Sequence, residues 1–147
     1  MSMTGIEVFD ATLQKTNEWL DDIADELALE NRHAAYAALR ATLHALRDRL
    51  VLEEAVHLGA QLPMLVRGFY YEAWRALPEP VKMHREEFLL RLEEELTGKS
   101  TVKLNSEAVV RAVFQLLSRR ISKGQIEQVE KSLPKDLRDL WPVSIAF

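Results

Sequence analysis

Apolar side chains recur every three or four residues along almost the whole chain, and charged side chains fill the positions between them. This spacing puts the apolar side chains on one face of a helix. No stretch alternates apolar and polar residues over the length of a strand, so the pattern predicts an all-α fold. It places helices at about residues 4–28, 52–61, 63–74 and 81–96, another after Asn31, and three more between residues 105 and 141.

Capping residues mark the ends of several of these helices. Thr4 is followed three residues later by Glu7, a capping-box pattern that opens the first helix. Asn31 is a good N-cap for the second helix, and Arg47 and Arg49 suit the negative end of its dipole. The caps and the apolar periodicity therefore predict the same helices.

Prolines divide the chain further. Two prolines within residues 77–80 cannot continue a helix, so this segment is the one clear linker. Pro63 and Pro134 each suit the first turn of a helix, because proline lacks only an N–H that would be unpaired there. Ser122, with Gln125 three residues on, opens the seventh helix.

The second half of the chain repeats the first at a fixed offset of 71 positions, without a gap. Identical residues occupy these paired positions: Ala37/Ala108, Arg40/Arg111, Ala41/Ala112, Leu46/Leu117, Arg49/Arg120, Leu62/Leu133, Pro63/Pro134 and Arg67/Arg138. We interpret the pattern as a tandem duplication of a four-helix unit, with repeats at 1–79 and 80–147. Each repeat is too small to bury its apolar faces alone. We therefore expect residues 1–147 to form a single compact domain in which the repeats pack about a pseudo-twofold axis.

Composition and charge exclude several classes of protein. Hydrophobic residues make up 48% of the chain and charged residues 29%, which is typical of a globular protein. A net charge of −4 argues against nucleic-acid binding, which depends on Lys and Arg. The chain has no cysteine, so disulfides and thiolate metal sites are excluded. It has neither a signal-peptide pattern nor an apolar run of ~20 residues, so we expect a cytoplasmic protein that does not enter a membrane.

Few residues suggest chemistry. Glu54 and His57 form a Glu-x-x-His pair of the kind that binds di-iron centres in helical bundles. The matched positions of the second repeat are Gln125 and Gln128, which are poor ligands. The serines lack a nucleophile elbow, and the glycines form no phosphate loop. We expect no catalytic residue, no metal and no cofactor, and the sequence favours a protein that is not an enzyme without deciding the question.

Six arginines stand at matched positions of the two repeats: Arg40, Arg49, Arg67, Arg111, Arg120 and Arg138. One interpretation is structural, because arginines tie helices together by pairing with carboxylates or with carbonyls at helix ends. The alternative is an anion site near the pseudo-axis.

The first repeat also has an aromatic run that the second lacks. Phe69, Tyr70, Tyr71 and Trp74 lie close together, whereas the second repeat offers only Trp141, at the position of Tyr70. Aromatic side chains are enriched at the centres of interfaces. The run either closes the core or forms part of a contact with a partner.

Two stretches carry a resemblance to a known family. The first, at residues 44–74, reads HALRDRLVLEEAVHLGAQLPMLVRGFYYEAW. The second comprises EEFLL at 86–90 and AVVRAVFQLLSRRISKGQIEQVEKSLPKDLRDLW at 108–141. Together they resemble the bacterial family known as domain of unknown function 2267, DUF2267. The resemblance implies a small, soluble, all-helical bacterial protein and implies no activity.

We therefore expect a non-enzymatic protein-interaction or scaffolding module whose partner is another protein or a second copy of the chain. The alternative is a small-molecule or anion binder, or an enzyme, that uses a pocket between the two repeats.

Overall fold

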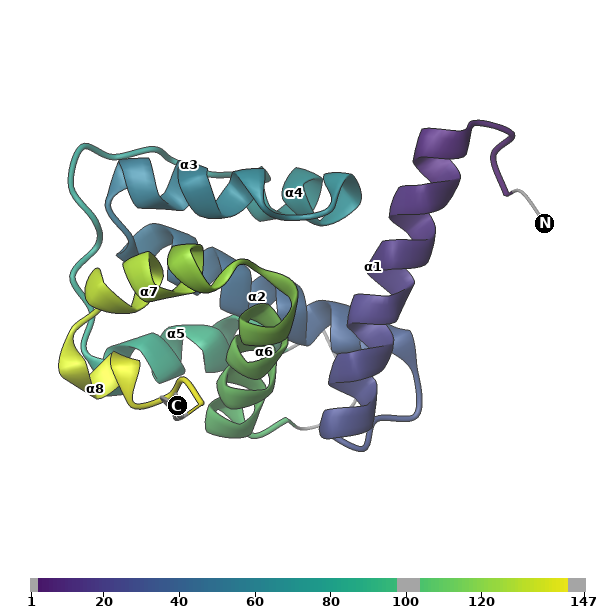
Figure 1. The fold of residues 1–147 in the computed structure, drawn as a ribbon. Coiled ribbons are helices and arrows are strands. Elements are labelled where there is room, and N and C mark those ends of the chain that lie inside the picture. The colour runs from purple at the N-terminus through teal and green to yellow at the C-terminus, as the bar shows by residue number, and fades with distance from the viewer. Residues whose placement is uncertain (1–2, 98–103, 143–147) are drawn as a thin grey trace.

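The computed structural model describes residues 3–97 and 104–142, which contain eight α-helices and no strand (Figure 1). The predicted all-α class is therefore confirmed. The helices are α1 (Glu7–Glu26), α2 (Arg32–Arg49), α3 (Leu52–Ala60), α4 (Met64–Tyr71), α5 (Arg85–Leu96), α6 (Ser106–Arg120), α7 (Lys123–Lys131) and α8 (Lys135–Arg138).

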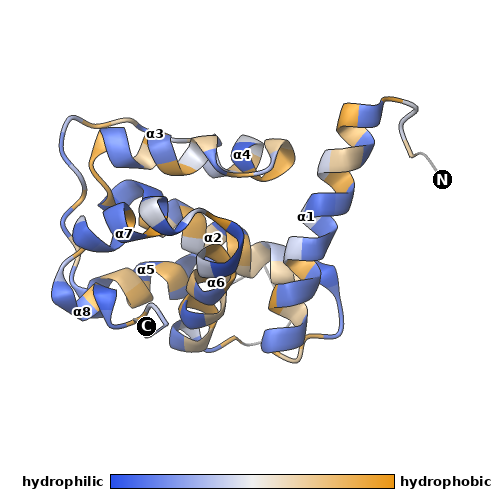
Figure 2. Ribbon diagram, viewed as in Figure 1, coloured by the Kyte–Doolittle hydropathy of each residue, from blue (hydrophilic) through white to orange (hydrophobic). Residues whose placement is uncertain are grey.

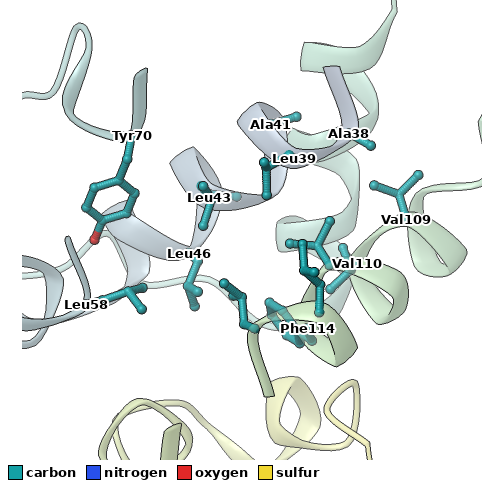
Figure 3. Close-up of a cluster of buried hydrophobic side chains, with 14 of the residues drawn as sticks. Ala38, Leu39, Ala41, Leu43, Leu46, Leu58, Tyr70, Val109, Val110 and Phe114 are labelled. Atoms are coloured by element: carbon teal, nitrogen blue, oxygen red, sulfur yellow. The ribbon is translucent and has the colours of Figure 1, made fainter. Parts of the chain in front are cut away.

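The core lies around α2 and α6, which pack against each other at the centre of the molecule. Both α1 and α5 contact both of these central helices. The closely spaced alanines of α2 let its neighbours approach, and Leu39, Leu43 and Leu46 of α2 are fully buried in the same core as Phe114 of α6 (Figure 3). Tyr70 enters the same core, where its hydroxyl donates to the carbonyl of Ala55 at 2.6 Å. One shared core therefore joins the two halves of the chain.

Several elements of the two halves match at the offset of 71 positions. Helices α3 and α7 each have 9 residues, and their bounds differ by that offset. Helices α2 and α6 end at the matched residues Arg49 and Arg120. Gln125 donates to Glu54 at 3.4 Å, and these two residues occupy the same position of the two repeats. A contact between matched positions is expected at a twofold axis, so it supports our proposal of a duplicated, pseudo-twofold arrangement.

The first helix begins later than predicted. The predicted start was Thr4, but α1 begins at Glu7, and the N-cap residue Ile6 has no side-chain cap. Thr4 bonds to Asp10 instead, through its backbone N–H at 2.9 Å and its hydroxyl at 2.8 Å. Gly5 makes this turn possible, because its φ of +80° lies in the left-handed region.

Helix α4 is shorter than the predicted 63–74, and α5 is shorter than the predicted 81–96. After α4 the chain turns at Ala73, whose φ is +57°. Residue Val81 is not helical, because its N–H bonds to the carbonyl of Asp48 at 2.9 Å. The linker is thus fastened to α2, and α5 begins only after His84.

Candidate functional site

Two buried side chains of α2 bind the backbone at the end of α4. His44 and Arg47 are each only 5% exposed. His44 Nε2 lies 2.6 Å from the carbonyl oxygen of Phe69. Arg47 donates to the carbonyl oxygens of Tyr70 at 2.7 Å and of Glu72 at 3.1 Å. Since a helix leaves its last carbonyls without partners, these bonds explain why α4 ends at Tyr71.

His44 is held in its neutral form. A carbonyl oxygen can only accept, so the proton of the neutral ring is on Nε2. Burial lowers the pKa of His44 below its ordinary value. The bond to Phe69 opposes this shift, while the charges of Arg47 and Arg40 add to it. The matched residue of the second repeat is Gln115, so either position needs a polar side chain rather than an imidazole.

A cleft of about 480 Å³ lies between α2, the segment 73–81 and α5. Its charged lining residues are Arg40, Arg47, Asp48, Arg75, Glu79, Arg91 and Glu95. Asp48 pairs with both Arg47 and Arg91, and Arg40 pairs with Glu72 at 2.6 Å. Among the described residues, Arg75 has no ion pair. Most charges of the cleft are therefore balanced within the chain.

The six arginines at matched positions do not converge on one site; each donates to a group of the protein. Their acceptors are Glu72 for Arg40, the Met83 carbonyl for Arg49, the Gly59 and Leu62 carbonyls for Arg67, the Asp139 carbonyl for Arg111, Asp22 for Arg120, and the Leu133 carbonyl for Arg138. Leu62 and Leu133 are themselves matched, so Arg67 and Arg138 donate to equivalent carbonyls, through Nη2 and Nε respectively. These bonds favour a structural role for the arginines.

The aromatic run is divided between the core and the surface. Phe69 and Tyr70 are buried, and burial raises the pKa of Tyr70. Tyr71 and Trp74 are half-buried, and their rings stack with centroids 5.4 Å apart. Of the four residues, only Tyr71 and Trp74 keep surface that a partner could contact.

An apolar stripe on α1 continues beyond the part that the core covers. Thr16, Leu20 and Ile23 of this stripe are buried. The same stripe continues towards the N-terminus through Leu13, Phe9 and Ile6, at helical spacing. Phe9 is 44% exposed and Ile6 49% exposed. Figure 2 shows hydrophobic residues recurring up to the N-terminal end of α1, which stands apart from the other helices.

Helix α4 borders this stripe and leaves a groove beside it. The N–H of Leu65 bonds to Thr12 Oγ1 at 3.0 Å, which fixes the start of α4 against α1. The groove between the two helices has a volume of about 430 Å³, and Thr16, Leu20, Leu65, Gly68 and Phe69 are among its lining residues. We define the docking surface as this groove together with Ile6, Phe9 and Leu13.

Among the residues that the structure describes, no further ligand completes the candidate metal pair. His57 Nδ1 lies 3.9 Å from Glu54, and the histidine is mostly exposed. Across residues 3–97 and 104–142, no three His, Asp or Glu side chains come together as a metal would need. Within the same residues, no helix combines the length and apolarity that crossing a membrane requires.

Sequence reasoning missed two features. It assigned Arg47 to a dipole interaction at a helix end, whereas the side chain is buried and binds α4. Its position one turn from His44 on the apolar α2 was the available signal. It also did not distinguish the covered from the uncovered turns of the first helix, because periodicity cannot show which turns of a stripe another helix covers.

Comparison with known proteins agrees with the resemblance noted in the sequence. No curated protein matches the chain. A family model described as "Uncharacterized conserved protein (DUF2267)" matches residues 16–140, which is nearly the whole chain. The chain therefore belongs to the DUF2267 family.

Proposed function

We propose that this protein is a non-enzymatic protein-interaction module and that its docking surface binds a helix of a partner. The observation that carries the proposal is the continuation of the α1 stripe through the half-buried Leu13 to the exposed Phe9 and Ile6. Apolar side chains on one face of a helix gain free energy when another apolar surface covers them. A groove next to an apolar helix face is a common way of binding an amphipathic helix.

Gly68 supports this proposal. A Cβ added at Gly68 would meet nothing within 4 Å, so no described residue requires a glycine there. A glycine inside a helix costs roughly 0.5–1 kcal/mol relative to alanine. Because Gly68 lines the groove, a glycine would let the backbone of a partner helix approach closely. The hydroxyl of Thr16, buried at the same groove, has no hydrogen-bond partner among the described residues.

The test uses helical peptides selected from a displayed library against the wild-type protein. Peptides that occupy the docking surface should bind the double variant Ile6→Ser/Phe9→Ser at least about tenfold more weakly, which corresponds to ~1.4 kcal/mol. The matched control is Val56→Ser/Leu90→Ser, which removes exposed apolar side chains elsewhere. Gly68→Leu should fill the groove and block binding while leaving the helix folded. Selected peptides that bind all of these proteins equally would disprove the proposal.

A second candidate function is the binding of a small anionic ligand in the cleft between α2, segment 73–81 and α5. It is favoured by Arg75, which lines the cleft without an ion pair among the described residues, and by the neighbouring ring of Trp74. Residues from both halves of the chain line this cleft. A screen of phosphate and carboxylate compounds by thermal shift tests it. A stabilising compound should lose its effect in Arg75→Gln, and a screen without any stabilising compound would count against the cleft.

A further inference from the structure

The two buried side chains that hold the end of α4 also line the cleft between α2, segment 73–81 and α5. His44 and Arg47 both border this cleft, although each is only 5% exposed. Polar groups buried to this extent normally use their hydrogen-bonding capacity. An unused donor or acceptor on either side chain is therefore an indication of what the cleft can bind.

Each of these side chains has one such polar atom. His44 Nε2 donates to the carbonyl of Phe69, but Nδ1 has no hydrogen-bond partner among the described residues. Arg47 donates through Nε and Nη1, and none of its bonds uses Nη2. Neither atom is sealed from solvent. Because the proton of the neutral His44 ring is on Nε2, Nδ1 is an acceptor, whereas Arg47 Nη2 is a donor.

Arg75 adds a positive charge to the same cleft. Its side chain is exposed and has no ion pair among the described residues, whereas the other three arginines of the cleft each pair with a carboxylate. Guanidinium groups bind carboxylates through charge-assisted hydrogen bonds. Arg75 and Nη2 of Arg47 therefore favour an anionic group with more than one acceptor oxygen.

The group that meets His44 should be a neutral donor. Burial lowers the pKa of His44, and the charges of Arg47 and Arg40 lower it further. The bond to Phe69 and the charge of Glu95 oppose this shift. The same two arginines would repel an ammonium group at Nδ1. A hydroxyl donates a hydrogen bond without adding charge, so it suits this position better.

Apolar side chains line another part of the cleft. Leu52, Leu77 and Val81 belong to it, and each is exposed. Covering such side chains gains free energy in proportion to the apolar area removed from water. A ligand with an apolar body would therefore bind more tightly than its polar groups alone allow.

We infer that the cleft binds a small hydroxycarboxylate with an apolar body. This inference rests on the second candidate function, anion binding in the same cleft, and adds the class of ligand. The carboxylate would accept from Arg47 Nη2 and approach Arg75. The hydroxyl would donate to His44 Nδ1, and the apolar body would cover Leu52 and its neighbours.

Four compounds that share one phenyl ring test the inference. Phenyllactate carries a carboxylate and a hydroxyl, and phenylpropionate lacks the hydroxyl. In the third compound, an alcohol, a methyl group replaces the carboxylate of phenyllactate, and in phenylalanine an ammonium replaces its hydroxyl. Binding to the isotope-labelled full chain is followed by calorimetry and by the nitrogen resonances of amides and imidazoles.

We expect phenyllactate to bind most tightly. Removing the hydroxyl should weaken binding about fivefold, as the loss of one hydrogen bond does, and removing the carboxylate should weaken it at least about tenfold. The resonance of His44 Nδ1 should move with phenyllactate and much less with phenylpropionate, because only phenyllactate donates a hydrogen bond to that nitrogen.

Arg75→Gln provides the matched comparison. It should weaken both carboxylates at least about fivefold and leave the ratio between them unchanged, since the hydroxyl contacts His44. Arg119→Gln makes the same change in net charge at an exposed position of α6 that does not line the cleft, and it should change neither affinity. If both variants act alike, the carboxylates respond to net charge and the inference fails.

The remaining outcomes separate the inference from the candidate function on which it rests. Equal binding of phenyllactate and phenylpropionate, with His44 Nδ1 unmoved, would keep an anion site and overturn the hydroxycarboxylate. Tighter binding of phenylalanine would also overturn it, and would assign the ammonium to Glu79, which lines the cleft without an ion pair among the described residues. Absence of binding by all four compounds would overturn the inference, and the thermal-shift screen would then decide the anion site separately.

Discussion

Gly59 of α3 lies against the hydroxyl end of the Tyr71 side chain. A Cβ at position 59 would stand 2.3 Å from Tyr71 Oη and 2.7 Å from Cζ, distances that real atoms do not adopt. The matched positions in the second repeat are Glu130 and Pro142, which have neither the glycine nor the ring. The absence of a side chain at Gly59 is therefore what lets Tyr71 pack on α3.

Gly59→Ala should consequently destabilise the protein by about 1 kcal/mol, because displacing the Tyr71 ring outweighs the helix propensity that alanine gains. In a Tyr71→Ala background the same substitution should become neutral or stabilising. Chemical denaturation of the four proteins of this double-mutant cycle measures the coupling. Equal effects of Gly59→Ala in both backgrounds would show that Tyr71 does not require the glycine.

Acidification should weaken the fold through His44. Burial lowers the pKa of His44 in the folded protein, so the unfolded chain binds more protons at this residue. The contribution of His44 to stability is therefore lost as the pH falls below its unfolded pKa of about 6.5. Between pH 7 and 5 the unfolding free energy should fall by at most about 1.4 kcal/mol per pH unit from this one site.

His44→Gln is the matched control for this pH dependence. Glutamine can still donate to the carbonyl of Phe69 and occurs at the matched position 115, but it does not titrate. The difference in unfolding free energy between wild type and His44→Gln should shrink or reverse as the pH falls. Parallel pH profiles of the two proteins would mean that His44 does not titrate differently on folding.

Arg47 should be among the least replaceable residues of the chain. Its buried guanidinium donates to Asp48 at 2.9 Å as well as to the carbonyls of Tyr70 and Glu72. Arg47→Met should cost about 3–5 kcal/mol, since it leaves two carbonyls without their donor and removes one of the two arginines that pair with the half-buried Asp48. Arg47→Lys should be almost as unstable as Arg47→Met, because an ammonium group cannot reproduce the planar, forked set of donors of a guanidinium. Thermal unfolding checks both variants, and a loss below about 1 kcal/mol for Arg47→Met would contradict this role.

Replacing Ala28 with glycine should stabilise the protein. Ala28 ends α1 with a φ of +54°, and the N–H of Leu29 closes the turn by bonding to the carbonyl of Ala24 at 2.8 Å. Glycine adopts this left-handed conformation without strain, so Ala28→Gly should stabilise the protein by about 1 kcal/mol. Ala11→Gly, at an exposed position inside the same helix, should instead destabilise it by roughly that amount. Denaturation midpoints that move in the same direction would refute the assignment of the turn.

Trp74→Ala should show whether helical peptides bind at the aromatic run or at the docking surface. Trp74 is half-buried and stacks on Tyr71, so its truncation should cost about 2 kcal/mol, less than the 3–5 kcal/mol of a fully buried tryptophan. Binding of the selected helical peptides should be unchanged. If instead stability is retained and peptide binding is lost, the interface is at Tyr71 and Trp74 rather than at α1 and α4.

Much of the fold could be predicted from the sequence because helices are local. The periodicity of α2 and α6, the N-caps Asn31 and Ser122, and the prolines at 63 and 134 each act over one or two turns. Side chains at these positions satisfy backbone groups within the same segment. Asn31 and Ser122 indeed accept from the backbone N–H three residues on, as their sequence positions predict.

Other features depended on contacts between distant segments. The ends of α4 and α5 shifted because Arg47 and Asp48, both on α2, bind the carbonyls of α4 and the N–H of Val81. No pattern inside residues 63–96 encodes those bonds. For the same reason the sequence left open whether Tyr70 closes the core or contacts a partner, and it could not show the bond from its hydroxyl to Ala55.

The sequence by itself determined that this chain is helical, where most helices lie and which family it belongs to, because those properties follow from short-range spacing and from the residues themselves. Only the tertiary structure decided which part of each apolar stripe is covered. Ile23 and Phe9 occupy the same face of α1, yet one is 1% exposed and the other 44%. The difference arises because α2 and α6 pack against α1 and leave its N-terminal end uncovered, which no periodicity along one helix can specify.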